Sequence, residues 1–285
     1  MVLRLLQEDL KILSLPDLGF EPDQLEVFTR AIKKPHGLIL VTGPTGSGKT
    51  TTLYAGLALL NKPSVNISTI EDPIEYRIPG INQAQVNPRV GFSFATGLRS
   101  LLRQDPNVIM VGEIRDGETA DIAINAALTG HIVLSTLHTN DALTAIPRLF
   151  DLGAPPFLVA QTLSLITAQR LMRRICEHCK ISYVLNRAEI KELETQFGLK
   201  DKGTRFFKGA GCTRCGHEGY KGRIGIHEVL EVTPAVAELM YKKALMPELR
   251  QAVRQAGMRT LVEDAFAKAS RGITTVAEII RVTKE

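Results

Sequence analysis

The sequence of 285 residues contains no tryptophan, and aromatic residues make up only 5% of it. Proteins that bind single-stranded nucleic acid stack bases on aromatic side chains, so this chain is poorly supplied for that role. Its net charge of +5 comes from 35 basic and 30 acidic residues. A mild excess of this kind is compatible with a nucleic acid or an anionic membrane, but an ordinary solvated surface accounts for it. No nucleic-acid partner is expected.

The sequence also lacks a long apolar run. The segment 157–168 is interrupted by four polar residues, whereas crossing a bilayer takes about 18 apolar residues. The N-terminus, MVLRLLQEDL, carries acidic residues early and has no small-residue cleavage site, unlike a secretory signal. With 44% hydrophobic residues, the chain can bury one large core or two smaller ones. We therefore expect a soluble, globular, cytoplasmic protein.

Cysteine is scarce, and all four cysteines fall in two C-x-x-C pairs: Cys176 with Cys179, and Cys212 with Cys215. Each pair can place two thiolates on one tight turn, and two such turns can enclose a tetrahedral ion. Redox dithiols and disulfides are the alternatives. A redox motif needs no second pair, and a cytoplasmic location disfavours disulfides. The spacing therefore predicts a structural Zn²⁺ site without an open coordination position.

The most informative segment that is present reads GPTGSGKT and follows the apolar run 37–42. Glycines allow backbone N–H groups to surround a triphosphate, and the following helix directs its positive end at the same anion. Lys49 is expected to bridge the outer phosphates and Thr50 to hold Mg²⁺. A glycine-rich turn that matches by accident is the alternative. The predicted nucleotide-binding residues are Gly43, Pro44, Thr45, Gly46, Ser47, Gly48, Lys49, Thr50 and Thr51.

Hydrolysis needs carboxylates beside the phosphate loop. The stretch IEDPIE at 70–75 ends a predicted strand, and VIMVGE at 108–113 is an apolar strand followed by Glu113. The second stretch has the form of a Walker B element, although the usual terminal aspartate is absent. Ligands of open α/β sheets bind at the carboxyl edge of the strands, where both stretches would lie. On the residues alone, the first stretch is equally compatible with a solvated loop.

Hydrophobic periodicity predicts an α/β protein with a mainly parallel sheet. We expect strands at 37–42, 66–70, 81–86, 108–111 and 131–137, and a short β-type link at 219–226. We expect helices at 21–33, 49–60, 94–103, 117–128, 142–152, 156–174, 187–197, 235–243, 246–256, 261–271 and 275–282.

Several long motifs occur in a fixed order: GPTGSGKTTT, TIEDPIEY, GLRSLLRQDPNVIMVGEIRD, TGHIVLSTLHTN and the two cysteine pairs. In this order they resemble the secretion ATPase family of type IV pilus assembly and type II secretion, from about Gly37 onward. The resemblance implies a RecA-like P-loop NTPase core in a homohexameric ring. It also implies that ATP hydrolysis, with Mg²⁺, moves an inner-membrane platform protein, with a cytoplasmic adaptor and peripheral association with the membrane.

The resemblance also implies roles for single residues. Glu75 would polarise the attacking water, and Glu113 would support Mg²⁺ through water. His138 would lie near the γ-phosphate and couple hydrolysis to domain movement. A satisfied histidine at a strand end is the alternative for His138.

Two arginines, Arg99 and Arg103, are four residues apart on one predicted helix and therefore share a face. The resemblance implies that they reach a nucleotide at a subunit boundary. Alternatively they pair with Asp105 and Asp116. Arg115 and Asp116 are expected to shape the turn after the strand.

The sequence divides into four predicted parts. Residues 1–20 would be the remnant of a preceding N-terminal domain and its linker, with at most the strand 2–6, and 21–174 the ATPase core. Residues 175–220 would form a zinc-binding subdomain and 221–285 a C-terminal helical lobe. Because the family normally carries a further N-terminal domain, we expect a motor core that binds ATP and hydrolyses it weakly unless a ring forms.

Within the family, the tetra-cysteine insertion favours the assembly or secretion branch over a pilus-retraction motor. The segment 219–229 slightly favours pilus assembly over type II secretion. A RecA-like nucleic-acid translocase and a non-catalytic nucleotide-sensing module are the alternatives from other functional classes.

Overall fold

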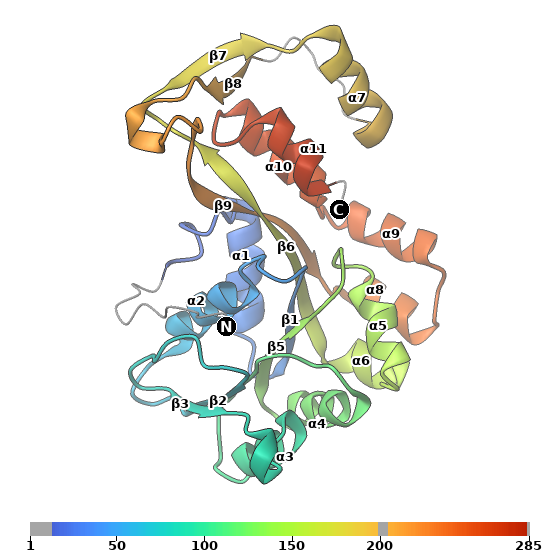
Figure 1. Cartoon of the computed structure of the whole chain (residues 1–285). Helices are drawn as coiled ribbons and strands as arrows, with labels where there is room; N and C mark the ends of the chain where they lie inside the picture. Colours follow the sequence, from blue (N-terminus) through green and yellow to red (C-terminus); the bar gives the residue numbers. More distant parts are fainter. Residues whose placement is uncertain (1–12, 199–204, 284–285) are drawn as a thin grey trace. The chain divides into compact units, whose positions relative to one another are not determined.

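The computed structural model describes residues 13–198 and 205–283 (Figure 1). The strand expected at 2–6 lies outside these residues. The chain divides into two compact units. The first unit takes residues up to Gln169 together with Val229–Met258, and the second takes Arg170–Glu228 together with the residues from Arg259 onward. This grouping cuts across the expected boundaries at 174/175 and 220/221, and the four-part division remains a prediction.

A seven-stranded sheet has the order β3-β2-β4-β5-β1-β6-β9. Its strands are β1 (Gly37–Thr42), β2 (Ile67–Glu71), β3 (Asn82–Gln85), β4 (Val108–Val111), β5 (Ile132–Leu137), β6 (Leu163–Ile175) and β9 (Tyr220–Glu231). Neighbouring strands from β3 to β6 pair in parallel. Their carboxyl ends therefore meet at one edge of the sheet, as the sequence predicts for a parallel α/β fold.

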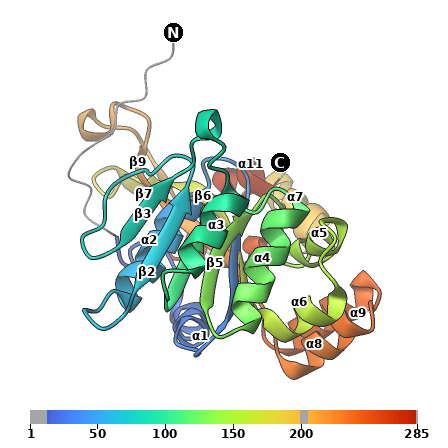
Figure 2. The same cartoon turned by 90° about the horizontal axis from the view of Figure 1, so that it is seen from below.

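The helices of the first unit follow the predicted ranges closely, with the exception of α6. They are α1 (Pro22–Ile32), α2 (Lys49–Leu60), α3 (Phe94–Leu102), α4 (Gly117–Leu128), α5 (Ala145–Asp151), α6 (Pro156–Thr162), α8 (Pro234–Tyr241) and α9 (Met246–Gln255), with a short 3-10 turn at Pro88–Val90. Side chains of β1 and β4 are buried on both faces of the sheet, so the sequences of these strands are almost continuously apolar. Ile39 and Val41 of β1 share a core with Phe28 of α1 and Leu53 of α2. The helices α3 and α4 cover the opposite face of the sheet from α1 and α2 (Figure 2).

One expected helix is wrong. The segment 156–174 is helical only to Thr162, and β6 begins at Leu163. A short apolar run cannot be identified as helix or strand from periodicity alone. Here the run pairs in parallel with β1, with Ile166 opposite Leu40. Long-range pairing with a buried strand therefore overrides the local pattern.

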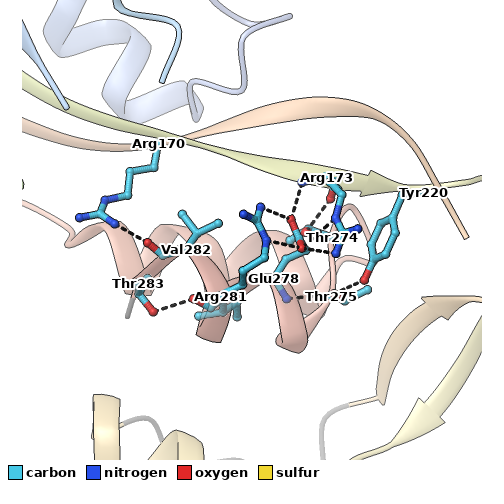
Figure 3. Close-up of polar contacts among 10 residues, drawn as sticks. Arg170, Arg173, Tyr220, Thr274, Thr275, Glu278, Arg281, Val282 and Thr283 are labelled. Carbon is cyan, nitrogen blue, oxygen red and sulfur yellow. Dashed lines mark hydrogen bonds and ion pairs between the residues drawn. The ribbon is translucent and has the colours of Figure 1, made fainter. Parts of the chain in front are cut away.

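The second unit contains an antiparallel pair that the sequence does not predict, β7 (Lys180–Val184) and β8 (Arg205–Gly209). It also contains α7 (Arg187–Phe197), a 3-10 turn at Thr213–Cys215, α10 (Leu261–Ser270) and α11 (Val276–Thr283). The carboxylate of Glu278 on α11 accepts hydrogen bonds from Arg173 and Arg281, as Figure 3 shows. In the described ranges, no helix has the length and apolar character of a membrane span.

Candidate functional site

The glycine-rich loop connects the end of β1 to the start of α2. Gly48 takes a left-handed conformation, with φ of 88°, immediately before the helix, and such a φ strongly favours glycine. A Cβ on Gly43 would lie 2.3 Å from the carbonyl oxygen of Gln169. Gly48 therefore requires glycine for its conformation, and Gly43, with φ of 145°, requires it for both conformation and space. Both requirements fit a phosphate-binding loop.

The loop is anchored from β6 by the buried side chain of Gln169. Its Nε2 donates to the carbonyl oxygen of Ser47 over 2.7 Å. Its Oε1 accepts from the Thr52 hydroxyl over 2.6 Å. Sequence analysis missed this residue, because it places 169 within a helix. The only signal for it would have been a correct assignment of β6 next to β1.

Lys49 is the first residue of α2, and its ammonium lies within the curve of the loop. Its Nζ donates to the carbonyl oxygens of Gly43, over 2.9 Å, and Pro44, over 3.1 Å. Burial lowers the pKa of Lys49, and the negative charge of Glu113 acts in the opposite direction. Of the remaining predicted loop residues, Ser47 is buried, Gly48, Thr50 and Thr51 are half-buried, and Pro44, Thr45 and Gly46 are exposed.

Glu113 follows β4 at the same edge of the sheet, and its side chain is 13% exposed. Its carboxylate pairs with Arg115 and lies 3.3 Å from Nε2 of His138. The hydrogen bond from Arg115 to Glu113 raises the pKa of Arg115. The structure thus brings Glu113 and His138 together, places the charge of Glu113 near Lys49, and adds Arg115 as a direct partner of the carboxylate.

The histidine-bearing loop is fastened to β1 through two threonines. The hydroxyls of Thr42 and Thr139 lie 2.7 Å apart, and the Thr139 amide donates to Thr42 Oγ1 over 2.9 Å. Thr42 is the last residue of β1, immediately before Gly43. These hydrogen bonds hold the loop that carries His138 next to the start of the glycine-rich loop.

The acidic stretch after β2 is divided between two environments. Glu71 is 2% exposed and forms hydrogen bonds with side chains of α2 and β3, whereas Asp72 is exposed. The negative charge of Asp72 also raises the pKa of Arg115. Glu75 is half-buried. Within the described residues, no ion pair or side-chain hydrogen bond joins Glu75 to Lys49, Glu113 or His138.

The two predicted arginines lie on or beside α3. Arg99 forms an ion pair with Glu118 of α4 over 2.6 Å, and both side chains are about half exposed. Arg103 is the C-cap of α3 and donates to the Ser100 hydroxyl over 3.2 Å. The alternative pairing with Asp105 and Asp116 is not found in the described part of the chain. Asp116 instead caps α4, in agreement with the expected role in the turn.

The four cysteines come together in the second unit, with all sulfur atoms within 4.8 Å of one another. Two distances across the pairs are 3.9 Å, and Cys212 and Cys215 are 3.7 Å apart. Bonds of about 2.3 Å to a tetrahedral zinc ion place sulfur atoms about 3.8 Å apart. Backbone amides of Cys212 and Gly219 donate to the sulfur of Cys215, each over 3.3 Å. The distances between the sulfur atoms therefore fit a tetrathiolate zinc site.

The chain resembles known proteins over its whole length. The family described as Type II/IV secretion system protein matches residues 1–281. The type IV pilus assembly ATPase PilB of Thermus thermophilus is 49% identical over 289 residues, covering 100% of this chain and 32% of that protein. The type II secretion system ATPase E of Vibrio cholerae is 49% identical over 284 residues, covering 100% of this chain and 56% of that protein.

Solved structures give the same result. A crystal structure of the pilus retraction motor PilT with bound ADP has a TM-score of 0.71 and 30% identity, covering 96% of this chain and 68% of that one. The ATPase DotB of Legionella pneumophila has a TM-score of 0.66 and 26% identity, covering 93% of this chain and 64% of that one. The chain spans about a third to just over half the length of the curated relatives described above. The resemblance seen in the motifs is confirmed: the chain belongs to the Type II/IV secretion system protein family.

Proposed function

We propose that this chain is the ATP-hydrolysing core of a motor for type IV pilus assembly or type II protein secretion. The observation that carries the proposal is the meeting of Lys49, Glu113 and His138 beside the glycine-rich loop, in a chain 49% identical to ATPases of both systems. The strand order, with β1 between β5 and β6, supports a RecA-like core. The core would be the part made of residues 21–174.

In this proposal the backbone amides of the loop and Lys49 bind the phosphates of ATP, and Thr50 and Thr51 lie at the start of the helix that faces them. Thr50 and Glu113 would hold Mg²⁺, the latter through water. The ion supplies charge neutralisation for the transferred phosphoryl group. His138 lies on Glu113 and is suited to respond to the γ-phosphate. Glu75 would orient the attacking water.

Arg99 and Arg103 would complete the site at a boundary between subunits of a homohexamer. The exposed ion pair between Arg99 and Glu118 is compatible with this role, because such a pair contributes little stability and can be exchanged for an anion. The ring would act on an inner-membrane platform protein with a cytoplasmic adaptor. The protein would thus be cytoplasmic and peripheral at the inner membrane.

The four cysteines would hold one Zn²⁺ with a structural role in a subdomain of residues 175–220. A closed set of four thiolates leaves no position for a substrate. A pilus-retraction motor is the second candidate, supported by the similarity to PilT over 96% of this chain. The cysteine cluster favours the assembly or secretion branch.

The test is steady-state ATP hydrolysis at several protein concentrations, together with calorimetric titration of MgATP. We expect turnover per chain to rise with concentration as a ring forms. Lys49→Ala should abolish nucleotide binding, and Glu113→Gln should bind MgATP without hydrolysing it. No affinity of the unaltered chain for MgATP would refute the proposal. Binding without hydrolysis at any concentration would instead favour a nucleotide-sensing module.

A further inference from the structure

The carboxylate of Glu71 is buried at the end of β2 and is surrounded by hydrogen-bond donors. The Tyr54 hydroxyl of α2 donates to one oxygen. The other oxygen accepts from Thr69 Oγ1 over 2.5 Å and from Gln83 Nε2 over 3.1 Å. A buried carboxylate costs free energy unless such donors satisfy it. Both oxygens of the Glu71 carboxylate therefore have hydrogen-bond donors. None of the functional roles described above involves this carboxylate.

Tyr54 joins this carboxylate to the helix that begins at Lys49. Burial raises the pKa of Tyr54 strongly, and the charge of Glu71 raises it further, so the phenol keeps its proton and remains a donor. The same phenol oxygen lies 3.4 Å from Nε2 of Gln83 on β3, which donates to it. The hydroxyl thus joins the end of β2 to the side chain that contacts the acidic turn, defined as residues 72–78.

Gln83 of β3 fastens the far end of the acidic turn. Its Nε2 also donates to the carbonyl oxygen of Tyr76 over 3.1 Å, and its Oε1 accepts from the Ile78 amide over 2.8 Å. The ring of Tyr76 packs edge-on against that of Tyr54, with centroids 4.7 Å apart. The acidic turn is consequently held at Tyr76 and at Ile78 by one polar cluster.

We propose that Tyr54 and Glu71 are a positioning pair that fixes the acidic turn, and with it Glu75, relative to the helix after the phosphate loop. Neither residue touches the nucleotide in this scheme. Loss of the pair would leave binding by the loop intact and would misplace the carboxylate that orients water. The consequence for turnover rests on the proposed ATP hydrolysis. Displacement of a reacting group by about 1 Å can cost about a hundredfold in rate.

The test compares Tyr54→Phe, Glu71→Gln and the double variant in the full chain. Tyr76→Phe is the matched control, because it removes a phenol of the same cluster whose hydroxyl makes no hydrogen bond among the described residues. Calorimetry gives the affinity and stoichiometry for MgATP, and turnover is expressed per bound nucleotide so that unfolded protein does not count. Hydrogen exchange of the backbone amides at 74–78 reports the order of the turn without reference to activity.

We expect Tyr54→Phe and Glu71→Gln to keep the affinity within about twofold and to lower turnover per bound nucleotide about ten- to a hundredfold. Because the Tyr54 hydroxyl acts through its hydrogen bond to Glu71, the double variant should fall little below the worse single variant. Exchange at 74–78 should accelerate in Tyr54→Phe and not in Tyr76→Phe. Should Glu71→Gln fail to fold, Tyr54→Phe decides.

Turnover of Tyr54→Phe equal to that of Tyr76→Phe would overturn the inference. If the unaltered chain does not hydrolyse ATP, the proposed function fails and the exchange measurement alone judges the positioning pair. Faster exchange in Tyr54→Phe than in Tyr76→Phe then supports it, and equal exchange overturns it.

Discussion

Replacing Glu278 by glutamine is expected to lower the free energy of unfolding by about 3 kcal/mol at neutral pH. The carboxylate is 1% exposed and accepts from the backbone amide and guanidinium of Arg173 and from the guanidinium of Arg281 (Figure 3). Burial by itself raises the pKa of this carboxyl. The hydrogen bonds of the two arginines outweigh burial and leave the pKa at about 2, against an ordinary 4.5.

The expected loss of stability follows from this lowering of the pKa of Glu278. A shift of one pKa unit corresponds to about 1.4 kcal/mol of preference for the charged form, so the lowered pKa corresponds to about 3 kcal/mol. The unfolded carboxyl binds its proton at a higher pH than the folded one. The contribution is therefore fully present above about pH 4.5 and is lost as the pH falls toward about 2.

Urea titration followed by circular dichroism, at pH 7 and at steps down to pH 3, measures both effects. The difference in the free energy of unfolding between the wild-type chain and Glu278→Gln should be largest at neutral pH and should become smaller below about pH 4.5. Glu238→Gln is the control, because Glu238 pairs with Lys242 on α8 with both side chains more than 60% exposed, and such pairs contribute little. A Glu278→Gln variant as stable as this control, or a difference that does not change with pH, would refute the reasoning.

Two further predictions concern the loop and the metal. Gln169→Leu should weaken MgATP binding about tenfold or more, because it removes the hydrogen bonds to Ser47 and Thr52 and leaves a buried carbonyl unpaired; calorimetry measures this, and unchanged affinity would contradict the anchoring role. Metal analysis should find about one zinc ion per chain. Cys212→Ser should lose the ion and unfold the second unit at lower urea; a metal-free chain of unchanged stability would contradict the tetrathiolate assignment.

The parts of the site that the sequence predicts are those encoded by contiguous residues. The glycine-rich loop, the strand at 108–111 with Glu113 after it, and the cysteine pairs each carry their spacing within a few positions, and the structure has them where they were expected. Local spacing suffices because a loop of this kind needs only its own backbone and the two elements that it connects. The expected parallel sheet follows in the same way from alternating strands and helices.

The parts that the sequence does not predict depend on residues far apart in the chain. Strand β6 lies beside β1 because of pairing between residues more than 100 positions apart, and its apolar run is ambiguous without that partner. The hairpin of β7 and β8 is interrupted by α7, so its register has no turn signal between adjacent strands. The anchoring role of Gln169 could be predicted only once β6 is placed beside β1. The role of Arg115 depends on the direction of its side chain, which forms an ion pair with Glu113.

The loops at the carboxyl edge are joined to one another by hydroxyl side chains other than the predicted site residues. The Ser135 hydroxyl donates to the carbonyl oxygen of Val111 over 2.7 Å, and the Thr136 hydroxyl to that of Gly112 over 2.8 Å, just before Glu113. In the loop that carries His138, the Thr139 amide donates to Thr42 Oγ1. Each of these hydroxyls is buried, and an apolar replacement of similar shape leaves a carbonyl or an amide without its partner. Thr136→Val therefore preserves every predicted site residue and should still impair the site. In the proposed site, the predicted residues would supply the chemistry, and buried hydroxyls and amides of the neighbouring strands fix their relative positions.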